Sequence, residues 1–211
     1  MADSSEYAAR LAIDYPEKLD RLTTFFRLIW AIPILIIYEL VNGSSASQYV
    51  DQAGKTVSST TGGVTIGLTV ATMLMIVFRQ RYPRWWFDFA VELARFGARV
   101  GTYVLLLTDQ YPSTVEAQAV HLEVEYPAVE TLNRWLPLVK WFLAIPHYIV
   151  LMVLGLVVVF VTIIAWFAIL FTGSYPRGLF DFVVGVGRWG TRVWAYAFLL
   201  VTDVYPPFSL R

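Results

Sequence analysis

The segment from Trp141 to Phe171 contains no Asp, Glu, Lys or Arg, and this apolar run limits the possible folds more than any other feature. As one helix it would be roughly 46 Å long, which exceeds the hydrocarbon core of a bilayer, about 30 Å. The 211-residue chain is 57% hydrophobic and 15% charged, beyond the usual range of soluble domains. The sequence therefore predicts an all-α integral membrane protein in which the run is divided.

An internal repeat indicates where the division falls, because two blocks of sequence recur in the same order. Leu19 to Pro33, LDRLTTFFRLIWAIP, resembles Leu132 to Pro146, LNRWLPLVKWFLAIP, 113 positions later. Tyr82 to Tyr103 resembles Tyr175 to Tyr196, 93 positions later, and the halves finish on TDQYP and TDVYP. The fall from 113 to 93 leaves twenty extra residues in the first half, which we assign to the polar segment 43–62.

The matching point in the second half lies next to Gly155, so we expect a water-facing turn there. Each half then contains a tight transmembrane helical hairpin, and the chain has four spans. The expected organisation is a first repeat over 1–112, with a hairpin at 24–78 that includes an outer loop at 43–62; an acidic linker at 113–131; and a second repeat over 132–211, with a hairpin at 136–172.

An amphipathic helix is expected after each hairpin, at 85–107 and 179–201, because the charges there recur every three or four residues and share one face. We interpret both as interfacial helices lying on the cytoplasmic leaflet. The alternative is a third span in each half, which gives six spans and inverted repeats.

The residues of these two stripes are the candidate functional residues. Arginine side chains can bind lipid phosphates or a protein partner, and tryptophan rings favour the headgroup level. The predicted contact residues are Arg84, Arg95, Arg99, Arg177, Arg188, Arg192, Trp85, Trp86, Trp189 and Trp194. Asp88 and Asp181 are expected to start and orient the helices through the positive N-terminal end of the helix dipole.

Charge distribution predicts the orientation of the chain. Most Lys and Arg residues flank one side of the expected spans, which places both termini in the cytoplasm by the positive-inside rule. The formal net charge is zero, so no overall field recruits nucleic acid. The expected partners are the lipid bilayer and other membrane-protein subunits.

Few residues indicate catalysis. The chain has no cysteine, and GVGRWG at 185–190 lies in an expected membrane helix, where its glycines are interpreted as packing residues. His147 has Ile34 at the matching position of the first half and is interpreted as structural. No metal site, cofactor site or catalytic group is predicted, and the chain is not expected to be an enzyme.

The second half, with KWFLAIPHYIVL and GSYPRGLFDFVVGVGRWGTRVWAYAFLLVTDVYPPFSL, resembles a bacterial membrane family catalogued as domain of unknown function 4389. The resemblance is close from Tyr126 to Leu210 and weaker from Tyr15 to Pro112, so the chain is interpreted as a tandem repeat of this domain. It implies a multi-pass protein of the bacterial inner membrane and brings no known activity. We therefore expect an accessory or scaffold subunit of a larger complex; the alternative is a small two-repeat transporter or channel whose arginine and aspartate stripes line the pathway.

Overall fold

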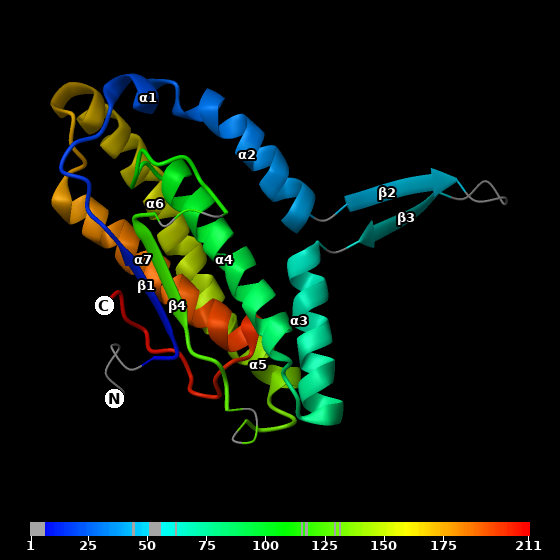
Figure 1. The fold of residues 1–211 in the computed structure, drawn as a ribbon. Helices are drawn as coiled ribbons and strands as arrows, with labels where there is room; N and C mark the ends of the chain where they lie inside the picture. The colour runs from blue at the N-terminus through cyan, green and yellow to red at the C-terminus, as the bar shows by residue number, and fades with distance from the viewer. Residues whose placement is uncertain are drawn as a thin grey trace.

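The computed structural model describes residues 7–43, 45–50, 56–61, 63–114, 116, 118–128, 130 and 132–211. Helices dominate this part of the chain, and two short two-stranded sheets accompany them (Figure 1). The elements are β1 (Ala9–Ile13), α1 (Arg21–Phe25), α2 (Arg27–Asn42), β2 (Ser45–Val50), β3 (Thr56–Thr61), α3 (Val64–Leu74), the π-helical turn η2 (Met75–Arg79), α4 (Arg84–Val104), β4 (Val120–Val124), α5 (Pro137–Leu143), α6 (Ile145–Thr172), α7 (Arg177–Trp194) and the π-helical turn η4 (Ala195–Leu199).

The long apolar run is one helix, so the predicted hairpin at 136–172 is wrong. α6 continues for 28 residues through Gly155, and a Cβ atom on this glycine would meet no atom within 4 Å. The residues next to Gly155 do not favour a turn. A continuous helix forms the backbone hydrogen bonds of the apolar run within the run itself. Pro146 stands in the first turn of α6, where the missing N–H has no helical partner to lose.

In place of the predicted hairpin at 24–78, the structure has the separate helices α2 and α3, and neither is a full span. α2 has 16 residues, a length of about 24 Å, which is short of a bilayer core. Among the described helices, α6 alone is long and apolar enough to cross a membrane. Neither the four-span fold nor the six-span alternative is therefore supported.

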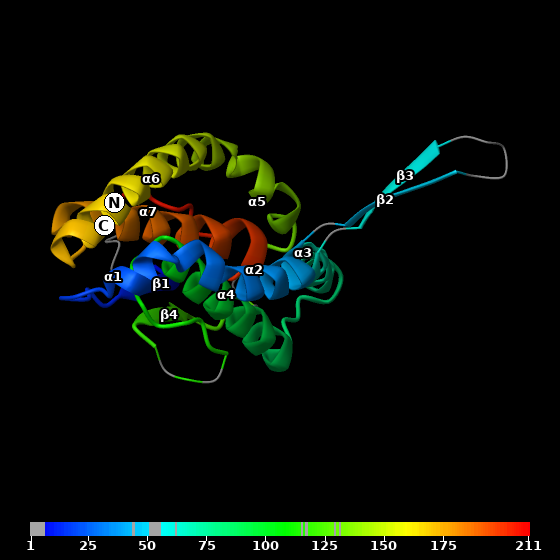
Figure 2. The same ribbon diagram turned by 90° about the horizontal axis from the view of Figure 1, so that it is seen from above.

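The segment predicted as an outer loop, 43–62, contains the strands β2 and β3. They pair antiparallel from Ser45 opposite Thr61 to Val50 opposite Thr56. Figures 1 and 2 show this hairpin extending away from the helices. Residues 44, 51–55 and 62 of the predicted loop lie outside the described residues.

A second antiparallel ribbon joins the N-terminal segment to the predicted linker. β1 pairs with β4, with Leu11 directly opposite Leu122. In both strands buried and exposed residues alternate, as expected when one face of a sheet is covered. The sequences ARLAI and VHLEV carry this alternation.

The two amphipathic helices form close to the predicted positions, as α4 and α7, but they are central rather than interfacial. α4 packs against α2 and β4, whereas α7 packs against α6 and β1. Figure 2 shows α7 between α6 and the rest of the bundle. The predicted interfacial placement is wrong because the β1–β4 ribbon and the segments that follow the two helices cover their charged faces.

Candidate functional site

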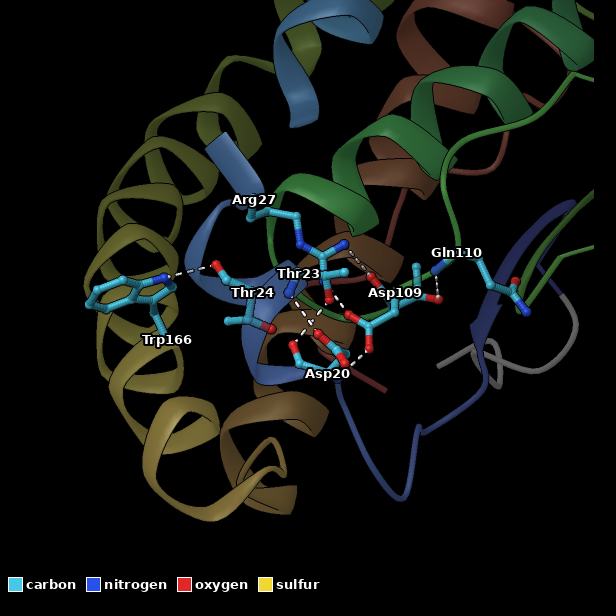
Figure 3. A network of polar contacts seen from close by, with 8 residues as sticks. Asp20, Thr23, Thr24, Arg27, Asp109, Gln110 and Trp166 are labelled. Atoms are coloured by element: carbon cyan, nitrogen blue, oxygen red, sulfur yellow. Dashed lines mark hydrogen bonds and ion pairs between the residues drawn. The ribbon is translucent and has the colours of Figure 1, made fainter. Parts of the chain in front are cut away.

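A buried arginine organises the first half. Arg27, at the start of α2, is 2% exposed; its Nη1 donates to the carbonyl of Thr108 at 3.0 Å, and its Nη2 forms an ion pair with Asp109 (Figure 3). The guanidinium carbon lies 4.1 Å from the centre of the Tyr103 ring. The other carboxylate oxygen of Asp109 accepts from the backbone N–H of Asp20 at 2.7 Å.

The surrounding network holds α1 in place. The side chain of Asp20 accepts from the N–H of Thr23 at 2.7 Å, which caps α1, and this backbone hydrogen bond lowers the pKa of Asp20. The indole of Trp166, on α6, donates to the carbonyl of Thr24 at 3.0 Å (Figure 3). The network therefore connects α1, α2, α6 and the chain that follows α4.

The second half has a buried lysine at the matching position. The Nζ of Lys140 donates to the carbonyl of Thr202 at 2.7 Å, lies 2.7 Å from Oδ1 of Asp203 and stands 5.2 Å from the centre of the Tyr196 ring. The backbone N–H of Asn133 donates to Asp203 at 2.6 Å. Burial lowers the pKa of Lys140, while Asp203 opposes that shift. Sequence-matched residues thus build two buried cation sites.

A strained residue precedes each Thr-Asp pair. Leu106 and Leu200 have φ angles of 64° and 62°, in the left-handed region, and both side chains are buried. This conformation costs a non-glycine residue about 1–2 kcal/mol. Each cation site holds the Thr-Asp pair that begins two residues after the strained leucine, so the ion pair and the strained backbone lie in the same short segment.

Two of the predicted arginines bind the β1–β4 ribbon. The Nε of Arg95 donates to the carbonyl of Leu122 at 2.9 Å, and the Nε of Arg188 donates to the carbonyl of Leu11 at 3.0 Å. Leu11 and Leu122 face each other in the ribbon, so the two arginines occupy related places on its two strands. Arg95 also forms an ion pair with Glu92.

Arg99 and Arg192 bind backbone in the segments that follow the Thr-Asp pairs. Arg99 donates to the carbonyl of Ser113 and Arg192 to that of Ser209, each at 2.5 Å. Arg192 is buried, which lowers the pKa of its guanidinium. These four arginines therefore contact the protein's own backbone within the fold.

Arg84 and Arg177 lie exposed at the beginnings of α4 and α7. Arg84 pairs with Asp88 at 3.1 Å and Arg177 with Asp181 at 3.8 Å, each one helical turn apart. Neither helix has a side-chain hydrogen bond at its N-cap. The contact observed for each aspartate is thus the arginine four residues earlier, and the helix-orienting role remains a prediction.

Each of the two Tyr-Pro-Arg corners is contacted by a tyrosine from a distant part of the sequence. Tyr15 donates to the carbonyl of Tyr175 at 2.5 Å, and Arg177 covers the Tyr15 ring at 4.1 Å. Tyr126 donates to the carbonyl of Tyr82, and Arg84 covers the Tyr126 ring at 4.8 Å. The corner of each repeat block is therefore completed by the segment that precedes the other block.

The predicted tryptophans separate into different environments. Trp85 is 69% exposed, whereas Trp86 donates to the hydroxyl of Thr72 at 2.8 Å. Trp189 is buried and donates from Nε1 to Nδ1 of His147 at 3.0 Å. Trp194 is half-buried and packs against the apolar cluster that contains Phe87 and Ala195. Only Trp85 is thus fully available to a headgroup or a partner.

His147, on α6, packs in an aromatic cluster with Trp189 and Phe208. Its ring stacks on Phe208 with centroids 4.0 Å apart, and it receives the Trp189 hydrogen bond described above. The matching residues of the first half, Ile34 and Phe96, form an apolar contact in the same kind of place. This correspondence agrees with the structural interpretation of His147.

A cavity of about 460 Å³ lies between α4, α7 and α3, beneath the β1–β4 ribbon. Its walls are apolar and hydroxyl-bearing side chains together with the amide of Asn42, and of the predicted contact residues only Trp194 lines it. In the part of the chain that the structure describes, no group of three or more His, Cys, Asp or Glu residues could hold a metal ion. The geometry therefore offers an apolar cavity and two buried ion-pair sites.

Residues 135–209 match the model of a family described as a domain of unknown function (DUF4389). The match extends from just before α5 to the C-terminal segment and finds a single copy of the domain. It therefore supports membership in this family for less than half of the chain. No curated protein and no solved structure matches the chain.

Proposed function

We propose that this chain is a non-catalytic protein of the bacterial inner membrane, acting as an accessory or scaffold subunit. The observation that carries the membrane assignment is the exposure of α6. Only 17% of its most apolar window is buried, whereas the core helix of a soluble protein is mostly buried. Met152, Leu156 and Phe160 are each at least 60% exposed, so the helix directs large apolar side chains outward.

The apolar exterior extends beyond α6 to other helices. On α2, Leu28 is 75% and Leu40 is 80% exposed, with further aliphatic side chains between them. The outer face of the β1–β4 ribbon is different, because it carries the ion pairs Arg10–Glu125 and Asp14–His121. In this proposal the helical surface contacts lipid hydrocarbon and the ribbon faces water.

The proposed ancestry is a tandem duplication of the domain, with the first half as a diverged copy. Support comes from matched residues that make matched contacts: the Arg27 and Lys140 sites, and the Arg95 and Arg188 contacts to the ribbon. Because residues of each half complete the Tyr-Pro-Arg corner of the other, the two copies would fold as one unit.

The β2–β3 hairpin supports the scaffold role. It projects from the helices (Figure 1), and its strands pair with each other while contributing little to the contacts among the helices. Projecting strand edges can receive a strand from a partner. The transporter alternative gains no comparable support, because the predicted arginines bind the chain's own backbone or carboxylates and none lines the cavity.

The membrane assignment is tested by liposome flotation of a variant in which Met152, Leu156 and Phe160 are changed to Lys. We expect the variant to lose flotation, because charges on a lipid-contacting surface are costly. A matched control places three Lys residues on the outer face of the ribbon, at Ala12, His121 and Glu123, and should float like the wild type. A freely soluble, folded wild-type protein that does not float would refute the proposal.

The scaffold role is tested by replacing residues 46–60 with a Gly-Ser linker and purifying both proteins in mild detergent. The wild type should retain a partner subunit at fixed stoichiometry, and the replacement should lose that partner while still floating with liposomes. Wild-type protein that purifies alone and moves ions in liposomes would instead support the transporter alternative.

A further inference from the structure

The cavity lies where the two repeat-matched helices face each other. α4 contributes Ala94, Gly97 and Gly101, and α7 contributes Gly187 and Gly190. Ala94 and Gly97 correspond to Gly187 and Gly190 in the 93-residue alignment of the two blocks. Small residues at facing positions usually allow helices to pack closely, yet here they line an open volume of about 460 Å³.

The threonine hydroxyls in the cavity wall already have partners. The hydroxyls of Thr69, Thr102 and Thr191 donate to carbonyls of their own helices, at 2.9 Å in each case. The Thr72 hydroxyl accepts from the indole of Trp86, and the Thr65 hydroxyl bonds to Asn42. No charged residue lines the cavity. A ligand with several polar groups would therefore leave most of them unpaired, and water would gain few hydrogen bonds.

The cavity is lined by residues of the β1–β4 ribbon and of the surrounding helices. Leu11 and Leu122 of the ribbon close one side, Val183 and Phe198 extend the apolar wall, and Tyr38 lies beside Asn42 near the end of α2. Gly101 and Gly190 mark the two facing helix surfaces, because a Cβ on either would meet no atom within 4 Å. The open space is thus adjacent to both helices, and a Cβ atom can be added at either glycine without a clash.

We propose that this cavity binds a single lipid acyl chain. The volume lies in the range of small-molecule pockets, and a linear hydrocarbon is the ligand class that suits a largely apolar wall whose threonine hydroxyls are already bonded. The chain is supplied either by a free fatty acid or by a phospholipid whose headgroup stays outside. The proposal rests on the proposed membrane location, since the bilayer is the source of the ligand.

Native mass spectrometry of the full-length protein, purified in mild detergent, tests the proposal. The decisive variants are Gly101→Leu, Gly190→Leu and their combination, which fill the cavity. The matched control is Gly155→Leu on α6, where a Cβ also meets open space but lies outside the cavity lining. The wild type and the control should carry one lipid adduct, and the double variant should lose it at least five-fold. The adduct mass distinguishes a fatty acid from a phospholipid.

A second measurement uses cis-parinaric acid with delipidated protein. Saturable fluorescence enhancement is expected for the wild type and for Gly155→Leu, and it should fall at least five-fold in each single cavity variant. The single variants therefore test the proposal even if the double variant does not fold. Equal binding by all variants, or no adduct and no probe binding by the wild type, overturns the proposal. Flotation of the same proteins distinguishes the membrane location from acyl-chain binding. Protein that floats but binds no acyl chain refutes the binding proposal and leaves the membrane location standing.

Discussion

At the level of single residues, two buried cations explain why the chain has charges inside an apolar fold. Arg27 and Lys140 are almost completely buried, and each has an aspartate, a threonine carbonyl and a tyrosine ring around it. A buried charge requires such compensation, because removal from water is costly. The sequence pairs Arg27 with Lys140, but it does not indicate that Asp109 and Asp203 are their partners.

We expect Lys140→Met to destabilise the fold by roughly 3 kcal/mol, because it leaves Asp203 without its cation. Arg84→Met removes an ion pair whose side chains are 67% and 54% exposed, and it should cost less than about 1 kcal/mol. Thermal unfolding in detergent, followed by circular dichroism, compares the two. Equal effects would show that Lys140 is not a structural cation.

The His147–Trp189 hydrogen bond should appear as coupling in a double-mutant cycle. His147→Ile and Trp189→Phe each leave one buried polar nitrogen unpaired, at about 1–3 kcal/mol. The double variant recreates the Ile34–Phe96 pair of the first half, so its cost should fall below the sum of the single costs by about 1 kcal/mol or more. Additive unfolding free energies would contradict a structural pair.

Alkaline pH should weaken the fold through Tyr175. Burial raises the pKa of this residue to about 12, above the ordinary value of 10.0, so the native state holds the proton more tightly than the unfolded state. The stabilisation is complete below pH 10 and is lost as the pH rises toward 12. Unfolding midpoints measured across this window should depend less on pH in Tyr175→Phe, and an unchanged slope would exclude this role for Tyr175.

At the level of elements, periodicity and composition predicted the helices that carry a charged stripe, and failed elsewhere for physical reasons. α4 and α7 lie near the expected positions because their polar and apolar faces alternate with the helical period. α6 is apolar on all sides, so its pattern contains no signal for a turn or for its absence. The pairing of β1 with β4 depends on a contact more than a hundred residues apart, which local patterns do not specify.

Continuity of α6 predicts the response to Gly155→Leu. Leucine has the higher helix propensity, and its Cβ meets open space, so the free energy of unfolding should stay equal or rise by up to about 1 kcal/mol. A turn at Gly155 would give the opposite sign. Circular dichroism of the purified variant measures both the helix content and the unfolding midpoint, and a loss of either would favour a broken helix.

At the level of the whole molecule, each half of the chain completes the other. β1 packs on α7, β4 packs on α4, and α1 packs on α6. Tyr15 and Tyr126 cross between the halves to reach the Tyr-Pro-Arg corners of Tyr175 and Tyr82. The repeat in the sequence indicated two similar units, but not this exchange, because a comparison of sequences contains no information about which copies are in contact.

The central claim concerns the apolar side of the molecule: the outer surface of α6 contacts lipid hydrocarbon. The chain has no native cysteine, so spin labels can be placed at single introduced cysteines. Suitable positions are Leu156 on α6, which is 60% exposed, and Glu123 on the exposed face of the ribbon.

Electron paramagnetic resonance of the labelled protein in liposomes measures the accessibility of each label to oxygen, which enters the hydrocarbon, and to a water-soluble nickel chelate. Lipid contact of α6 predicts high oxygen and low nickel accessibility at residue 156, with the reverse at residue 123. High nickel accessibility at both positions would contradict it.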